Sequence, residues 1–163
     1  MVCRSTTQVF PFLCPFVFFV ANLLLHKYQT KGNPMAWDNI NALCDIVRET
    51  GFAIHKYHRN CHLEKVYENA LAHRLRKQGL HVEQQFPLTV YDEDGTVIGE
   101  YFADLFVEGC LIIELKACRE IADEHIAQIL GYLKSSRIET GLLINFGAAK
   151  FAIKKYLMTA AAE

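Results

Sequence analysis

One short run of residues, Thr140 to Asn145, limits the fold more than any other part of the chain. It reads TGLLIN and lacks the alternation of apolar and polar residues that is typical of a strand with one face in water. A continuous apolar run of this length predicts a strand that is buried on both faces. The chain has 163 residues, which suffice for one domain with a substantial core.

The segments around this run predict a regular succession of helices and strands. Helices are expected where apolar residues recur at helical spacing, over 38–57, 62–78 and 123–135. Strands are expected where apolar residues alternate or run together, over 82–90, 97–107, 111–117 and 140–145. The residues from Gly147 onward predict a last helix. The resulting order, α-α-β-β-β-α-β-α, has no internal repeat or linker and indicates one compact α/β domain.

The first thirty-four residues differ from the rest. Val9 to Leu25 is an almost unbroken apolar run, but it is short for a transmembrane helix and contains two prolines in its first half. We favour the interpretation that translation begins at Met35, so that 1–34 is an upstream extension and 35–163 is the domain. A membrane anchor or secretory signal, and an ordinary tail, are the two alternatives.

The charge balance excludes a protein that depends on bulk attraction to nucleic acid. The chain has 17 basic and 18 acidic residues, and residues 1–34 hold three of the basic ones and no acid. Binding of nucleic acid by the remainder would therefore need a local basic rim or bound metal cations.

The six cysteines and seven histidines follow no zinc-ligand or disulfide spacing. This usage favours reduced thiols and a cytoplasmic protein, with membrane association as the alternative if residues 9–25 are an anchor.

Three charged residues interrupt two apolar strands. Asp104 lies within 101–107, and Glu114 and Lys116 lie within 111–117. Charged groups inside such strands are costly to bury unless they are paired or bind a metal. One interpretation is an Asp–Lys ion pair on a solvated face. The other is a divalent-metal site, in which Lys116 shares a face with Glu114 because strand side chains alternate.

The length of the loop between the two strands decides whether Asp104 and Glu114 lie on the same face of the sheet. If residues 108–110 form a three-residue hairpin loop, Val107 pairs with Leu111 and Asp104 lies opposite Glu114 on one face. A two-residue loop would send the two acids to opposite faces. The metal interpretation therefore requires the longer loop, or a bulge of the same parity.

These residues resemble a known nuclease pattern. Ala-Asp at 103–104 and Glu-Leu-Lys at 114–116 are similar to the PD-(D/E)XK nuclease superfamily. More narrowly, residues 39–156 resemble the GxxExxY family of small bacterial and archaeal proteins. Five stretches carry the resemblance: LEKVYENAL (63–71), GEYFADL (99–105), IIELKA (112–117), HIAQILGYL (125–133) and GLLINFG (141–147). The resemblance implies a restriction-endonuclease-like three-layer α/β/α core with a central mixed sheet.

The resemblance also implies roles for individual residues. Asp104 and Glu114 would be metal ligands, Glu64 would be an outer ligand or would orient water, and Lys116 would support the nucleophilic water and the phosphate. Gln128 and Tyr132, four residues apart on one helix face, would position the phosphate or Lys116.

Two positions depart from the family pattern. Ala103 replaces the proline before the aspartate, and Cys61 stands where the family has the glycine of its motif. Glycine there suits a turn that enters a helix, so Cys61 puts the local backbone in question. Tyr67 matches the motif's tyrosine, for which we expect core packing at least as much as a direct role.

The implied activity is that of a Mg²⁺-dependent phosphodiester hydrolase acting on nucleic acid, with Mn²⁺ as an alternative ion and no small-molecule cofactor. The competing hypothesis is a non-catalytic module that keeps the fold and binds nucleic acid or protein. The sequence leaves open whether the substrate is DNA or RNA, whether action is endo- or exonucleolytic, and whether the protein is a homo-oligomer.

Overall fold

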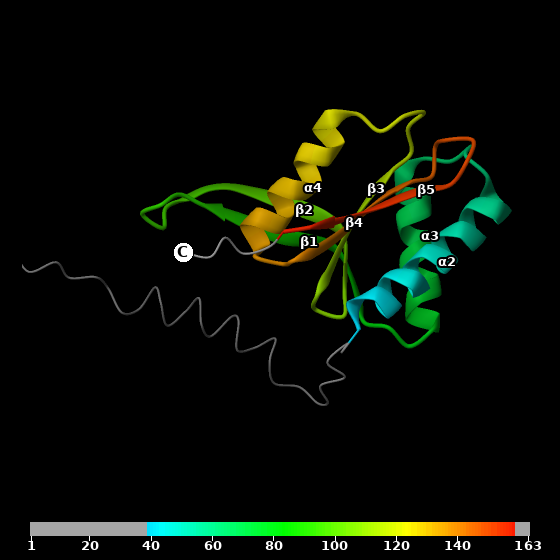
Figure 1. Cartoon of the computed structure of the whole chain (residues 1–163), viewed down its shortest axis with the longest axis horizontal. Coiled ribbons are helices and arrows are strands. Elements are labelled where there is room, and N and C mark those ends of the chain that lie inside the picture. Colours follow the sequence, from blue (N-terminus) through cyan, green and yellow to red (C-terminus); the bar gives the residue numbers. More distant parts are fainter. Residues whose placement is uncertain (1–38, 159–163) are drawn as a thin grey trace, which may run out of the picture. The chain divides into compact units, whose positions relative to one another are not determined.

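The computed structural model describes residues 39–158, which contain three helices and five strands (Figure 1). The helices are α2 (Ile40–His58), α3 (Glu64–Lys77) and α4 (Asp123–Ser136). The strands are β1 (Val82–Tyr91), β2 (Val97–Val107), β3 (Leu111–Lys116), β4 (Thr140–Asn145) and β5 (Ala152–Leu157). The predicted type of element is confirmed for all of these but β5.

The five strands form one mixed sheet in the order β1-β2-β3-β4-β5. All neighbours are antiparallel except β3 and β4, which are parallel with Leu111 opposite Thr140 and Lys116 opposite Asn145. Parallel neighbours need a crossover, and α4 supplies it. The predicted α/β fold with a central mixed sheet is confirmed.

The prediction of a last helix after Gly147 is wrong. Residues 152–157 form β5, which pairs antiparallel with β4 from Thr140↔Leu157 to Asn145↔Ala152. Without β5 the hydrogen-bonding groups along one side of the buried strand β4 would lack partners, which is unfavourable. Pairing with the edge of β4 therefore stabilises residues 152–157 as a strand, although the local sequence suggested a helix.

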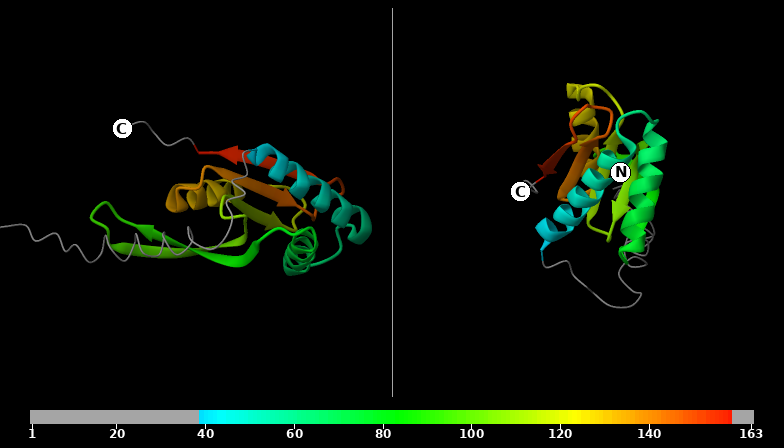
Figure 2. Two further views of the ribbon diagram at one scale, coloured as in Figure 1. Left: turned by 90° about the horizontal axis from the view of Figure 1, so that it is seen from below. Right: turned by 90° about the vertical axis from the view of Figure 1, so that its right-hand side faces the viewer.

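Helices cover both faces of the sheet (Figure 2). On one face, α2 and α3 pack on the sheet through a core that includes Leu43, Leu71, Leu115 and Ile144. On the other face, Leu133 of α4 packs in a second core with side chains of β1, β2 and β3. The arrangement is the expected three-layer α/β/α sandwich.

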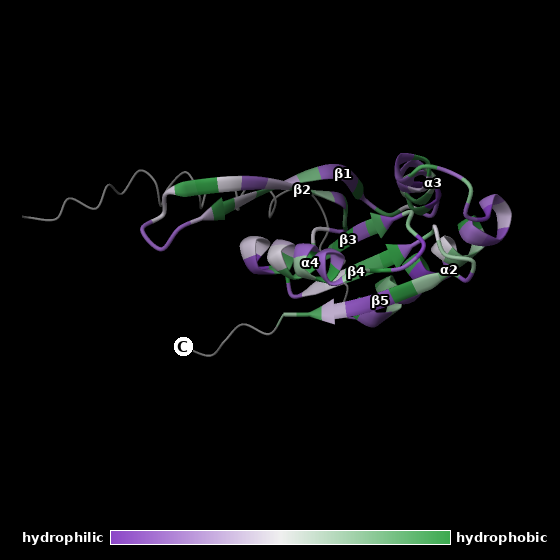
Figure 3. Ribbon diagram, turned by 90° about the horizontal axis from the view of Figure 1, so that it is seen from above, coloured by the Kyte–Doolittle hydropathy of each residue, from purple (hydrophilic) through white to green (hydrophobic). Residues whose placement is uncertain are grey.

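Strand β4 lies at the centre of these layers, and all six of its residues are buried. It is hydrophobic along most of its length (Figure 3). The predicted burial on both faces is confirmed. At Gly141 a Cβ atom would lie 3.0 Å from Ile129 and 3.1 Å from Leu133, so a residue without a side chain lets α4 approach the sheet closely.

The predictions for residues 1–34 lie outside the described residues, and so does the apolar run over 9–25. Within residues 39–158, no helix is long and apolar enough to cross a membrane. In the same range Cys44, Cys61, Cys110 and Cys118 are free thiols.

Deletion of residues 1–34 is expected to leave the melting temperature unchanged. The buried faces of α2, α3 and α4 are covered by the sheet and by one another within the described residues. Thermal unfolding of the full chain and of residues 35–163 would test this. A fall of several degrees on deletion would contradict the proposed boundary.

Candidate active site

The hairpin between β2 and β3 has the predicted longer loop. Val107 pairs with Leu111, so residues 108–110 form a three-residue loop, in which Glu108 and Gly109 have φ values of 54° and 68°. The backbone pairing extends to Leu105↔Ile113. The register therefore has the parity that the metal interpretation requires.

At the point where this pairing ends, Asp104 holds the two strands together through its side chain. Its Oδ2 accepts a hydrogen bond of 2.8 Å from the backbone N–H of Leu115. Its other oxygen, Oδ1, accepts one of 3.3 Å from Nε2 of Gln85 on β1. The Asp104 carboxylate is thus fixed between β1 and β3.

Strands β1 and β2 both reverse their side-chain alternation beside Asp104. Val82 packs in the core under α2 and α3, whereas Leu88, also at an even position, packs in the core under α4. On β2, Leu105 and Ala103 belong to these two cores in the same way. The reversal in β1 lies at Gln85, a non-glycine residue with φ of 52°. The predicted strand over 82–90 is therefore present as β1, but its period-two alternation changes at Gln85.

Glu114 and Lys116 form an ion pair on β3. Lys116 Nζ lies 2.6 Å from Glu114 Oε1. Glu114 is only 2% exposed, and its second oxygen, Oε2, is buried without a hydrogen-bond partner. A carboxylate oxygen in this position is unusual, because buried polar atoms normally have partners.

Glu64 reaches the same end of β3 from the first residue of α3. Its Oε2 accepts a hydrogen bond of 3.2 Å from the N–H of Ala117, just after β3. An acidic residue is favoured in the first turn of a helix by the helix dipole. Glu64 therefore approaches the strand from the second helix, as the sequence predicted.

The carboxylates influence one another electrostatically. Burial is the main cause of the raised pKa of Glu114, which lies at about 7, and the charges of Asp104 and Glu64 raise it further against the opposing effect of Lys116. Burial also raises the pKa of Asp104, with a smaller contribution from the charges of Glu64 and Glu68, although the Leu115 N–H and Lys116 oppose it. The three predicted acids are thus close enough to interact.

Lys116 remains a cation in this setting. Burial acts to lower the pKa of its ammonium group, but the hydrogen bond to Glu114 and the charges of Glu114, Glu64 and Asp104 outweigh that effect and raise the pKa. The side chain is therefore positively charged beside three carboxyl groups.

Helix α4 brings Tyr132 toward this group. Burial, and then the charge of Glu114, raise the pKa of the Tyr132 hydroxyl, which accepts a hydrogen bond of 2.6 Å from Gln128 Nε2. Gln128 thus contacts Tyr132 directly. The pair shares one helix face, as its spacing predicted.

Two further side chains that the sequence did not indicate, Glu68 and Gln85, lie beside Asp104. Glu68 is 2% exposed, and it accepts hydrogen bonds from Lys65 (2.6 Å), Gln84 (2.8 Å) and Gln85 (2.9 Å). Its position four residues after Glu64 places both acids on one face of α3, which is the signal that could have indicated it. Gln85 had no signal in the sequence, because its contacts depend on the distortion of β1.

The two departures near the start of α3 are structurally accommodated. The positive φ in the preceding loop belongs to Arg59, at 57°, and Cys61 has no such requirement. Tyr67 is fully buried, and its ring stacks on Phe146 with centroids 4.7 Å apart. Its hydroxyl donates a hydrogen bond of 2.7 Å to the carbonyl of Arg59. Tyr67 is thus packed in the core with its hydroxyl satisfied.

The donor set suits a hard divalent cation, although it is not a complete site. Carboxylate oxygens are the ligands that Mg²⁺ prefers, and Glu114 Oε2 has no other partner. Within residues 39–158, no group of three or more histidine, cysteine or acidic side chains is arranged to hold an ion. The chemistry of the residues fits a metal, while water or a bound phosphate would have to supply further ligands.

A comparison with protein families now identifies the group to which this arrangement belongs. The family described as the PD-(D/E)XK nuclease superfamily matches residues 41–156. The chain belongs to the PD-(D/E)XK nuclease superfamily. Asp104 and the Glu114-Leu115-Lys116 segment of this superfamily member lie inside the matched range.

Other comparisons add little to this assignment. The solved structure titled "Crystal structure of SSO0001" is similar to 57% of this chain with 19% identity and a TM-score of 0.49. The match spans 48% of that chain, about half its length. No curated protein matches this chain significantly.

Substitution Glu114→Gln is expected to remove a loss of stability that the metal-free superfamily member undergoes as the pH rises toward 7. Because the pKa of Glu114 rises from 4.5 to about 7 on folding, the folded state keeps a proton that the unfolded chain releases. The contribution of the protonated Glu114 carboxyl group to the free energy of unfolding is therefore full below pH 4.5 and is lost as the pH rises through about 7. At about 1.4 kcal/mol per pKa unit, the loss is of the order of 3 kcal/mol.

Urea unfolding at several pH values would measure this effect. The free energy of unfolding of the wild type should fall relative to Glu114→Gln between about pH 4.5 and 7, and added Mg²⁺ at about pH 8 should restore the wild type alone. Glu93→Gln, in the exposed turn between β1 and β2, is the matched control. Parallel pH curves for the wild type and Glu114→Gln would contradict the raised pKa.

Proposed function

We propose that this protein is a Mg²⁺-dependent nuclease that hydrolyses phosphodiester bonds in nucleic acid. The observation that carries the proposal is the buried Glu114 carboxylate, which has one oxygen without a partner and the other paired with Lys116. A buried acid of this kind is unfavourable for stability alone. A role in binding a cation would explain its presence beside Asp104 in a superfamily of nucleases.

Asp104 and Glu114 would hold the ion, and Glu64 would bind it directly or orient a water molecule. When bound, a divalent cation would stabilise the charge on the phosphate and lower the pKa of a coordinated water. The hydrogen bonds from Leu115 to Asp104 and from Ala117 to Glu64 fix these carboxylates at the end of β3. The carboxylate ligands would thus be ordered before the ion binds.

Lys116 would stabilise negative charge that develops on the phosphate. Its ammonium group is held 2.6 Å from Glu114 Oε1 and is largely buried, so its charge is poorly screened by solvent. A cation ordered before the reaction contributes most at the transition state, where the phosphate carries the additional charge. Gln128 and Tyr132, which are hydrogen-bonded to each other, would position the phosphate from α4.

The substrate class follows from the superfamily, and the GxxExxY resemblance would place the protein in a narrower family within it. The slightly acidic balance of the chain limits nonspecific attraction to nucleic acid. Lys65, whose side chain is 56% exposed in the first turn of α3, is one cation that could contact a phosphate beside the site. Substrate contact would therefore be local to the site.

A cleavage assay on the full chain tests the proposal. Plasmid, single-stranded DNA and RNA substrates would be incubated with Mg²⁺, with Mn²⁺ and with EDTA, and binding of each ion would be measured by calorimetry. Metal-dependent cleavage that EDTA abolishes is the expected result. A protein that binds nucleic acid or a protein partner, but cleaves none of these substrates with either ion, would be the non-catalytic module.

A further inference from the structure

The distortion of β1 at Gln85 connects two carboxylates from different elements of the fold. Gln85 Nε2 donates hydrogen bonds to Oε2 of Glu68 (2.9 Å) and to Oδ1 of Asp104 (3.3 Å). Both bonds come from one amide group, which joins α3 to β2. Gln85 itself is exposed, so hydrophobic packing does not account for its position.

Glu68 is anchored independently of Gln85. Its Oε1 accepts hydrogen bonds from Lys65 (2.6 Å) and from Gln84 (2.8 Å), and the residue is buried. With these donors in place, Glu68 has little capacity to bind a metal. It is a fixed acceptor that orients the Gln85 amide.

The backbone conformation of Gln85 is costly. A residue with a side chain rarely adopts a φ of 52°, and such strain persists only where the surrounding structure enforces it. The same distortion lets β1 and β2 exchange the faces of their side chains beside Asp104. The strained residue and the proposed metal ligand therefore lie at one point of the sheet.

We propose that Gln85 is a positioning residue, whose amide, anchored on Glu68, holds Oδ1 of Asp104 while the Leu115 N–H holds Oδ2. The expected consequence is a higher affinity for the divalent cation, and this part of the inference rests on the proposed function. Partners that orient a metal ligand typically contribute about 10- to 100-fold to affinity. Neither Glu68 nor Gln85 contacts the ion in this scheme.

Substitution Gln85→Asn separates positioning from folding. Asparagine tolerates a positive φ better than glutamine, so the melting temperature is expected to stay the same or rise. Its amide is one methylene shorter and cannot reach both carboxylates. Mn²⁺ affinity, measured by calorimetry on the full chain, is therefore expected to fall about tenfold. Gln78→Asn is the matched control, because the exposed Gln78 at the end of α3 contacts Thr50 and Arg74 but neither Glu68 nor Asp104, and it should leave the affinity close to that of the wild type.

A second measurement reports on Asp104 without a metal. Hydrogen exchange of the Leu115 amide, which donates to Asp104 Oδ2, should be faster in Gln85→Asn than in the wild type and unchanged in Gln78→Asn. A lower melting temperature with unchanged Mn²⁺ affinity and unchanged Leu115 exchange would show a purely structural role and overturn the inference. If the wild type binds no Mn²⁺, the proposed function fails, and the Leu115 exchange alone then decides whether Gln85 positions Asp104.

Discussion

Asp104→Asn is expected to lower metal-dependent cleavage by roughly 10³-fold or more. Loss of a residue that only hydrogen-bonds to a metal ligand typically costs roughly 10- to 100-fold, and loss of the ligand itself should cost more. Asparagine keeps the size of the side chain, and its Oδ1 can still accept the hydrogen bond from Leu115. It removes the negative charge that would hold the cation. The new Nδ2 group would face the Gln85 amide, which is also a donor, so that hydrogen bond would be lost. Because burial already disfavours the charged form of Asp104 and raises its pKa, loss of the charge should offset this, and the variant should fold.

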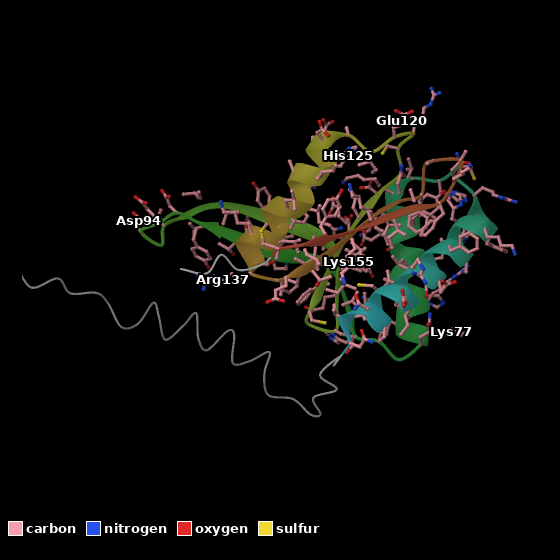
Figure 4. The ribbon with its side chains drawn as sticks, in the orientation of Figure 1. Lys77, Asp94, Glu120, His125, Arg137 and Lys155 are labelled. Atoms are coloured by element: carbon pink, nitrogen blue, oxygen red, sulfur yellow. The ribbon has the colours of Figure 1, made fainter. Side chains whose placement is uncertain are left out.

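Asp94→Asn is the matched control for this substitution. Asp94 lies in the turn at the far end of the β1–β2 hairpin, away from the three helices (Figure 4), and is exposed. Cleavage by Asp94→Asn should equal that of the wild type. Wild-type cleavage by a folded Asp104→Asn protein would remove Asp104 from the proposed site.

Lys116→Met is expected to lower cleavage by roughly 10²-fold, the scale for loss of one group that stabilises transition-state charge. Methionine keeps much of the apolar stem and removes the ammonium group. Affinity for Mg²⁺ should hold or increase, because a positive charge beside Asp104 and Glu114 is lost. In an enzyme this substitution thus lowers cleavage, whereas a binding module has no metal-dependent cleavage to lose.

The substitution also affects folding, so the assay needs a matched stability control. Removal of Lys116 leaves the buried Glu114 carboxylate without its partner, and breaking a buried pair typically costs about 3–5 kcal/mol. Cleavage should therefore be measured well below the melting temperature, beside Lys77→Met at the exposed end of α3 (Figure 4). If the wild type binds Mg²⁺ but cleaves nothing, and Lys116→Met behaves identically, the nuclease proposal is wrong and a binding module remains.

The sequence was sufficient for those features that depend on residues near one another in the chain. The helical spacing of apolar residues located α2, α3 and α4, and the continuous run at β4 predicted burial on both faces. The length of the loop at 108–110 set the register of β2 and β3 from Val107↔Leu111 to Leu105↔Ile113. These properties follow from local backbone geometry and side-chain periodicity, so no knowledge of distant contacts was needed.

Packing of the whole domain was needed for the features that depend on distant partners. Residues 152–157 became β5 because the buried edge of β4 needed hydrogen bonds, a requirement that the local pattern does not contain. Gln85 adopts its strained conformation where Glu68 from α3 and Asp104 from β2 both accept its amide. The sequence named the acids of the candidate site, but only packing three layers together could show which oxygen of Glu114 stays without a partner.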